Sequence, residues 1–120
     1  MLKQRLINQD KYNVKCPYPM TPKGICIHNT ANDATAEGER NNVNRPDNNA
    51  EVSFHIAIDD KEAIQLIPFN RNTWHAGDGA NGQGNRNYIS IEICYSLSGG
   101  ERFINAEKRA AKEVAALLKQ

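Results

Sequence analysis

The sequence predicts one small α/β or α+β domain, in which helices pack on a single β-sheet. Three observations support this fold class. The chain has 120 residues, the length of one domain. Segments 52–59 and 88–95 alternate apolar and polar residues, as half-buried strands do. The segment that ends at Gln120 repeats apolar residues at helical spacing.

The predicted strands cover residues 24–28, 52–59, 63–67 and 88–95. In the first, alternation places Cys26 and His28 on the same face. The second and third are joined by the turn at residues 59–61 and are expected to pair as a hairpin. In segments 52–59 and 88–95, every second residue is apolar and these residues are expected to share a face. The two sets are Val52, Phe54, Ile56 and Ile58, and Ile89, Ile91, Ile93 and Tyr95.

The other segments contain helix or loop signals. Residues 1–22 are expected to form an irregular arm, because their three prolines disfavour helix. A weak helix is expected over 33–45, and the segment 70–87, rich in Asn and Gly, is expected to be a loop. Asn105 is a plausible N-cap for a helix that runs to Gln120. Its apolar stripe comprises Ala106, Ala110, Val114, Leu117 and Leu118.

The composition excludes several classes of function. The chain has 15 basic and 14 acidic residues, a balance that predicts no nucleic-acid or anionic-membrane partner. No apolar run is long enough to predict a membrane span. The first ten residues lack the apolar core of a secretory signal, so we expect synthesis in the cytoplasm. The odd cysteine count, from Cys16, Cys26 and Cys94, predicts free thiols.

Two polar residues in the strands are candidates for chemistry. His28 ends its strand, where an imidazole can offer a metal ligand to a cleft; the alternative is a histidine hydrogen-bonded in a loop. Glu92 is the only charge in an apolar strand. Such a carboxylate is either functional or exposed to water on one face of the sheet. His55 is expected to be a buried histidine whose hydrogen bonds are satisfied.

The segment from Trp74 to Gly79 contains the only tryptophan beside a histidine and two glycines. An indole in such a loop suits stacking on a sugar or peptide, but it also suits a lid over the core. If their strands are neighbours, four residues could converge as a zinc site: Cys26, His28, Glu92 and Cys94. The two cysteines are better explained as small apolar core residues.

Several sequence strings together resemble a known family. They are KCPYPM at 15–20, IHNTAND at 27–33, VSFHIAIDD at 52–60, IQLIPFNRNTWHAGDG at 64–79, GNR at 84–86 and ISIEICYSLSGG at 89–100. In order and spacing they are similar to the zinc amidases that include phage amidase-type lysozymes, autolytic amidases and the peptidoglycan recognition proteins. The resemblance is strongest to N-acetylmuramoyl-L-alanine amidases of Bacillus prophage and autolysin type.

This resemblance implies roles for individual residues. His28 matches the first zinc ligand, and Glu92 matches the carboxylate that acts on the attacking water. Asn29 and Trp74 match positions lining the substrate cleft, and His75 belongs to the same motif. We therefore expect His28 and Glu92 to open onto one cleft with Trp74 at its rim. The implied substrate is peptidoglycan, cut between the lactyl group of N-acetylmuramic acid and L-alanine. An enzyme of this kind without a signal is expected to reach the wall after lysis.

Members of the family usually take two further zinc ligands from a segment after the last helix predicted here. We therefore expect residues 1–120 to be the N-terminal portion of a single amidase catalytic domain, with a mixed sheet like that of the recognition proteins and the C-terminal part missing. The zinc site is expected to be incomplete. A non-catalytic peptidoglycan-binding module and an inactive remnant are the alternatives that the sequence leaves open.

Overall fold

The computed structural model describes residues 2–120 and contains one five-stranded mixed sheet. The strands are β1 (Leu2–Gln4), β2 (Gly24–Asn29), β3 (Ile56–Ile58), β4 (Ala63–Gln65) and β5 (Tyr88–Ile93). Their spatial order is β1-β4-β3-β5-β2. Only the β3–β4 pair is antiparallel, and it forms the predicted hairpin; the other three pairs are parallel.

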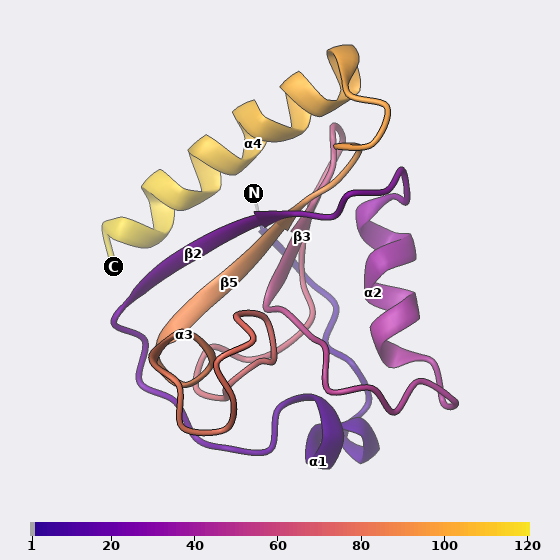
Figure 1. The fold of residues 1–120 in the computed structure, drawn as a ribbon. Coiled ribbons are helices and arrows are strands. Elements are labelled where there is room, and N and C mark those ends of the chain that lie inside the picture. Colours follow the sequence, from indigo (N-terminus) through magenta and orange to yellow (C-terminus); the bar gives the residue numbers. More distant parts are fainter. Residues whose placement is uncertain (1) are drawn as a thin grey trace.

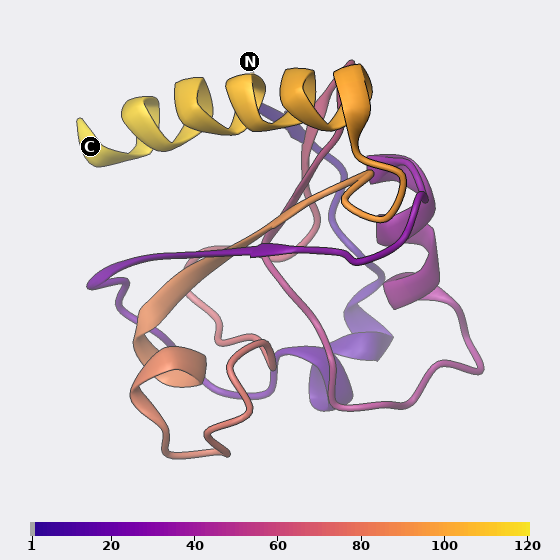
Figure 2. The same ribbon diagram turned by 45° about the horizontal axis from the view of Figure 1, so that its top comes forward.

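Helices cover both faces of the sheet, which confirms the predicted fold class. The longest helix, α4 (Gly100–Leu118), lies along one face, and α2 (Ala36–Asn44) lies on the other side (Figures 1 and 2). The short helix α3 (Gln83–Asn87) directly precedes β5, and the other short helix, α1 (Tyr12–Lys15), lies in the segment before β2 (Figure 1). Among residues 2–120, no helix is long and apolar enough to cross a bilayer.

The apolar core is divided by the sheet into two clusters. One is built from strand isoleucines and the buried stripe of α4; its strand and helix members include Ile56, Ile58, Ile89, Ile91, Ile93, Ala106 and Ala110. The other lies on the α2 side and includes Ala36, Val43, Phe54, Ala57, Ile64, Leu66 and Cys94. Alternation along β5 therefore sends isoleucines to the α4 side and leaves Ser90 and Glu92 on the α2 side.

The strand predicted over 52–59 is shorter than expected. Regular pairing begins only at Ile56, and Val52 is exposed. Phe54 packs in the α2-side cluster, whereas Ile56 and Ile58 pack on the α4 side, so the three do not share a face. The strand predicted over 88–95 likewise ends at Ile93, because Tyr95 has a positive φ of 70° and turns into the α2-side cluster.

The prediction of an irregular arm over 1–22 was wrong in part. The arm contributes β1, which pairs in parallel with β4, and the short helix α1. Both elements precede the three prolines, so the proline signal applies only to the stretch after Lys15. The missed elements are short, and tertiary contacts stabilise them more than local propensity does.

Helix boundaries also differ from the predictions. The predicted helix over 33–45 forms, but its N-cap is Thr35, whose hydroxyl accepts a hydrogen bond from the amide of Gly38 at 2.9 Å. The last helix begins at Gly100 rather than after Asn105, because Gly99 (φ 64°) turns the chain directly into it. Its stripe packs as predicted, except that Leu118 is exposed. The loop predicted over 70–87 ends in α3.

Candidate active site

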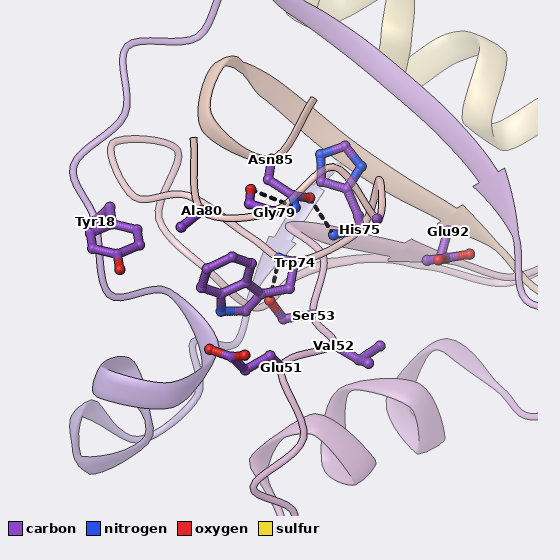
Figure 3. Close-up of a pocket in the computed structure, with 11 residues that line it drawn as sticks. Tyr18, Glu51, Val52, Ser53, Trp74, His75, Gly79, Ala80, Asn85 and Glu92 are labelled. Carbon is purple, nitrogen blue, oxygen red and sulfur yellow. Dashed lines mark hydrogen bonds between the residues drawn. The ribbon is translucent and has the colours of Figure 1, made fainter. Parts of the chain in front are cut away.

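A pocket of about 540 Å³ opens on the α2 side of the sheet, beyond the end of α3. In Figure 3, Tyr18 and Glu92 lie at opposite ends of this pocket, with Trp74 between them. The lining comes from four separate parts of the chain: Tyr18; Glu51, Val52 and Ser53; Trp74, His75, Gly77, Gly79, Ala80 and Asn85; and Glu92. The loops on this side of the sheet therefore converge on one cleft.

The neighbouring strands β2 and β5 place two of the predicted residues side by side. His28 on β2 is in register with Glu92 on the neighbouring parallel strand β5. Residues in register on adjacent strands point to the same face of a sheet, so both side chains lie on the pocket side. Glu92 and Trp74 line the pocket directly. His28 reaches the pocket through His75, which lines it.

Glu92 lies in an environment unusual for a carboxylate. Its Oε2 atom is buried and has no hydrogen-bond partner among residues 2–120. Burial, together with the negative charge of Glu39, raises the pKa of Glu92 to about 7. Loss of hydration disfavours the charged form, and no cation compensates it here. A carboxyl group with a pKa near neutrality can both accept and donate a proton at neutral pH.

Beside Glu92, three side chains with metal-ligand atoms form a cluster. One ligand atom from each of Cys26, His28 and His75 lies within 4.8 Å of the others. The Nε2 atom of His28 is 3.0 Å from Nδ1 of His75 and 3.4 Å from the sulfur of Cys26. Among residues 2–120 this is the only such group of three. The cluster shares Cys26 and His28 with the four-residue zinc site considered above, but it contains His75 in place of Glu92 and Cys94.

The N-terminal arm holds Trp74 in the pocket wall. The indole Nε1–H donates to the carbonyl of Val14 at 2.8 Å, and the backbone amide donates to the Ser53 hydroxyl at 3.0 Å. Tyr18 meets the indole edge-on, with ring centroids 6.0 Å apart. The indole is thereby oriented by the arm while part of its surface stays in the cleft.

Lys15 explains how the loop before β3 is positioned. Its side chain is fully buried, and its ammonium group donates to the carbonyls of Ala50 and Val52 and to the side chain of Asn48. The Ser53 hydroxyl in turn donates to the Lys15 carbonyl at 2.6 Å. Burial lowers the pKa of Lys15, but three oxygen acceptors surround the group. A lysine on the arm therefore fixes the wall formed by residues 51–53.

Comparison with known proteins identifies the family. A profile of the family described as N-acetylmuramoyl-L-alanine amidase matches residues 18–120. The chain belongs to the N-acetylmuramoyl-L-alanine amidase family. It is 59% identical over 119 residues to the amidase CwlA of a Bacillus species, and 55% identical over 117 residues to CwlA of Bacillus subtilis strain 168.

Solved structures of relatives share the fold. The structure of PlyL is 53% identical and superposes with a TM-score of 0.92, covering 99% of this chain and 73% of that one. The catalytic domain of XlyA is 38% identical, with a TM-score of 0.85 and a coverage of 99% and 76%. The alignment with the CwlA of the Bacillus species covers 99% of this chain but only 47% of that protein. The alignment with the B. subtilis CwlA covers 98% of this chain and 42% of that protein. The chain thus spans about half the length of the curated relatives it matches.

Not every predicted site residue of the amidase-family chain lies in the pocket. Asn29 is exposed at the end of β2, in register with Ile93, and alternation directs it away from the face that carries His28. His55 is fully buried, as predicted, and its ring contacts the Ser90 backbone amide at 3.0 Å and the Arg71 carbonyl at 2.8 Å. Burial lowers the pKa of His55 to about 4, so the ring is neutral.

The sequence interpretation missed several residues of the amidase-family pocket. Glu51 lies outside the strings quoted above, whereas Ser53 and Asn85 lie within VSFHIAIDD and GNR but were given no role there. Asn85 is buried, and its side-chain oxygen accepts a hydrogen bond from the amide of His75 at 2.8 Å (Figure 3). The same oxygen accepts a second hydrogen bond from the amide of Ala76, also at 2.8 Å. An Asn ten residues beyond a Trp-His pair, in a stretch rich in glycine, is the only signal that the sequence offers for this role.

Proposed function

We propose that this chain is the catalytic part of a zinc-dependent peptidoglycan hydrolase. The bond cut is the amide between the lactyl group of N-acetylmuramic acid and L-alanine of the stem peptide. The observation that carries the proposal is Glu92: a half-buried carboxyl with a pKa of about 7, opening onto a pocket of about 540 Å³, beside a histidine in register. Membership of the amidase family supports the reaction class.

The residues around Glu92 fit a zinc ion. His28 offers an imidazole on the same face of the sheet, and Cys26 and His75 add the donor types that zinc prefers. The unpartnered Oε2 of Glu92 indicates that a group which would satisfy it lies outside the protein's own side chains. We propose His28 as a zinc ligand. A bound zinc ion supplies Lewis-acid chemistry, which polarises an amide carbonyl and makes water more acidic.

The chain's own residues supply the proton transfers. In the ionised state, Glu92 accepts a proton from the attacking water as its oxygen bonds to the carbonyl carbon. The protonated carboxyl then donates that proton to the nitrogen of L-alanine as the C–N bond breaks. The products are a lactyl carboxylate on the sugar and a free amino group on the peptide. Because its pKa is near neutrality, Glu92 can perform both steps at the same pH.

Trp74 and Tyr18 supply the surface for binding. Two aromatic rings in edge contact line the pocket on the side away from Glu92. Aromatic faces stack on sugar rings, and the pocket is long enough to separate this contact from the carboxyl (Figure 3). Trp74 is therefore proposed to bind the muramic acid residue, and His75, which lines the pocket, remains a predicted contact of the substrate. Peptidoglycan is the proposed partner, reached after release from the cell in which the protein is made.

Product analysis with a matched pair of variants tests this proposal. The protein, supplied with zinc, is incubated with purified peptidoglycan, and new amino groups and new reducing sugars are measured separately. We expect amino groups on L-alanine and no reducing ends. Glu92→Gln is expected to lower the rate by about 10²–10⁴-fold with zinc retained, as for the loss of a general base. Glu107→Gln, an exposed carboxylate on α4 that does not line this pocket, is the control and is expected to keep activity within about tenfold.

Two results would contradict the proposal. New reducing sugars would identify a glycosidase instead. Full activity of Glu92→Gln would leave Glu92 as a solvated strand residue. A protein that binds peptidoglycan but releases neither group would favour the non-catalytic binding module.

A further inference from the structure

His75 lines the pocket and also contacts His28. The two rings lie edge to face, with centroids 5.2 Å apart, and Nδ1 of His75 is 3.0 Å from Nε2 of His28. On its other side, Nε2 of His75 is 2.7 Å from the backbone carbonyl of Gly84. The three groups form a continuous row of polar atoms leading to the proposed zinc ligand.

The carbonyl at the end of this row determines where the hydrogens are. A carbonyl oxygen can only accept, so Nε2 of His75 must carry a hydrogen. In the neutral ring Nδ1 of His75 is then an acceptor. The hydrogen between the two rings therefore comes from Nε2 of His28.

The other nitrogen of His28 is left open. Nδ1 of His28 has no hydrogen-bond partner among residues 2–120, and with Nε2 protonated it carries a lone pair. A histidine that binds a metal through one nitrogen commonly donates its other N–H to a fixed acceptor. We propose that His75 is a positioning residue that fixes His28 in the tautomer with Nε2–H and Nδ1 free to bind the metal; this inference rests on the proposed function.

The distances favour this arrangement over a three-ligand clamp by Cys26, His28 and His75. Two nitrogens bound to one tetrahedral zinc at about 2.0–2.1 Å each are about 3.3 Å apart. The observed 3.0 Å lies instead at the usual length of an N–H hydrogen bond. Cys26 fits the same description, because its sulfur is 3.4 Å from Nε2 of His28 and can accept a weak hydrogen bond from it.

Two substitutions of His75 separate its two hydrogen bonds. In His75→Asn the amide oxygen takes approximately the place of Nδ1, so the contact with His28 can persist while the one with Gly84 is lost. In His75→Gln the amide reaches the place of Nε2, so the contact with Gly84 can persist while His28 loses its acceptor. The tautomer of His28 is determined from two-bond ¹H–¹⁵N NMR correlations of the metal-free 120-residue chain. The sample is kept at a pH well above the ordinary pKa of histidine.

We expect one tautomer in the wild type, with a protected proton on Nε2 of His28. This proton is expected to persist in His75→Asn and to exchange rapidly with water in His75→Gln. The zinc affinity of the protein is expected to fall by about 10–100-fold in His75→Gln and by less in His75→Asn. The NMR readout needs neither zinc nor substrate, so a failure of the proposed function would not be confused with a failure of this inference.

The inference is overturned if His28 carries its proton on Nδ1 in the wild type, or if both variants behave alike. Cobalt titration of the 120-residue chain provides a further check. A thiolate-to-cobalt absorption band that disappears in Cys26→Ser would mean that the cluster clamps the metal directly and that His75 is a ligand. No such band is expected.

Discussion

The two faces of β5 differ in polarity. Toward α4 the strand presents Ile89, Ile91 and Ile93, which pack against the alanines of the helix. Toward the pocket it presents Ser90 and Glu92, residues that pair with histidines or lack a partner altogether. Residues one position apart thus lie in a dry core on one side and in a polar site on the other.

The α4 face of β5 contributes to folding stability, whereas the pocket face contains the groups proposed to take part in the chemistry. The α4 face contains no titratable strand residue, so its contribution to folding should not depend on pH. The pocket face contains two groups whose pKa values differ from their ordinary values in opposite senses: that of His55 is lowered to about 4 and that of Glu92 is raised to about 7. The contribution of this face to the free energy of unfolding should therefore vary with pH. Three experiments compare the two faces.

The largest expected effect comes from the α4 face. Ile91 is fully buried, and Ile91→Ala is expected to lower the free energy of unfolding by about 2–5 kcal/mol, through lost burial and the cavity left behind. The loss should be the same at pH 5 and pH 8. It can be measured by urea unfolding, with the exposed Ile27→Ala on β2 as the control. A loss that changes with pH by more than about 1 kcal/mol would show that the two faces are coupled.

The next effect concerns His55 and acid. Its pKa is lowered from 6.5 to about 4 in the folded state, because burial disfavours the charged ring. The unfolded chain therefore binds a proton first, and the stability due to neutral His55 is present above pH 6.5 and lost as the pH falls through 4. We expect a loss of about 3 kcal/mol over that window.

The variant His55→Asn isolates this contribution. The amide oxygen can accept the hydrogen bond from the Ser90 amide but does not titrate. The variant is expected to be less stable than the wild type at pH 7 and to lose less stability on acidification. The measurement is the difference between their unfolding free energies from pH 7 to pH 4. If the two curves run parallel, His55 does not carry the acid sensitivity.

The same comparison explains what the sequence could predict. Alternation in YISIEICY assigns Ile91 and Glu92 to opposite faces, because the side-chain period of a strand is two. Alternation also places His28 on a single face of its strand, and the parallel pairing of β2 with β5 makes that the face of Glu92. The fold class and the pairing of β3 with β4 follow from the same kind of local pattern.

Residues that act over long sequence distances were not predictable in this way. Lysine is rarely buried, and the acceptors of Lys15 lie 33 to 37 residues away, so its position in an apparently irregular arm gave no signal. The contact between His28 and His75 spans 47 residues and depends on how the loop after Trp74 folds back through Asn85. Such contacts depend on tertiary structure rather than on periodicity.

The smallest expected effect concerns Glu92 in the metal-free chain. Its pKa is raised from 4.5 to about 7, so the folded state holds a proton that the unfolded state has already released. The wild type therefore loses stability as the pH rises from 4.5 to 7, whereas Glu92→Gln, which stays neutral, does not. Because the side chain is partly exposed, solvent screening should limit the gain of the variant at pH 8 to about 1–2 kcal/mol. At pH 4 the two proteins should unfold at the same urea concentration. Glu37→Gln, on the exposed part of α2, serves as the control and is expected to show no such gain. Equal stability of Glu92→Gln and wild type at both pH values would mean that water reaches Glu92 freely, and the two faces of β5 would then differ in composition but not in electrostatics.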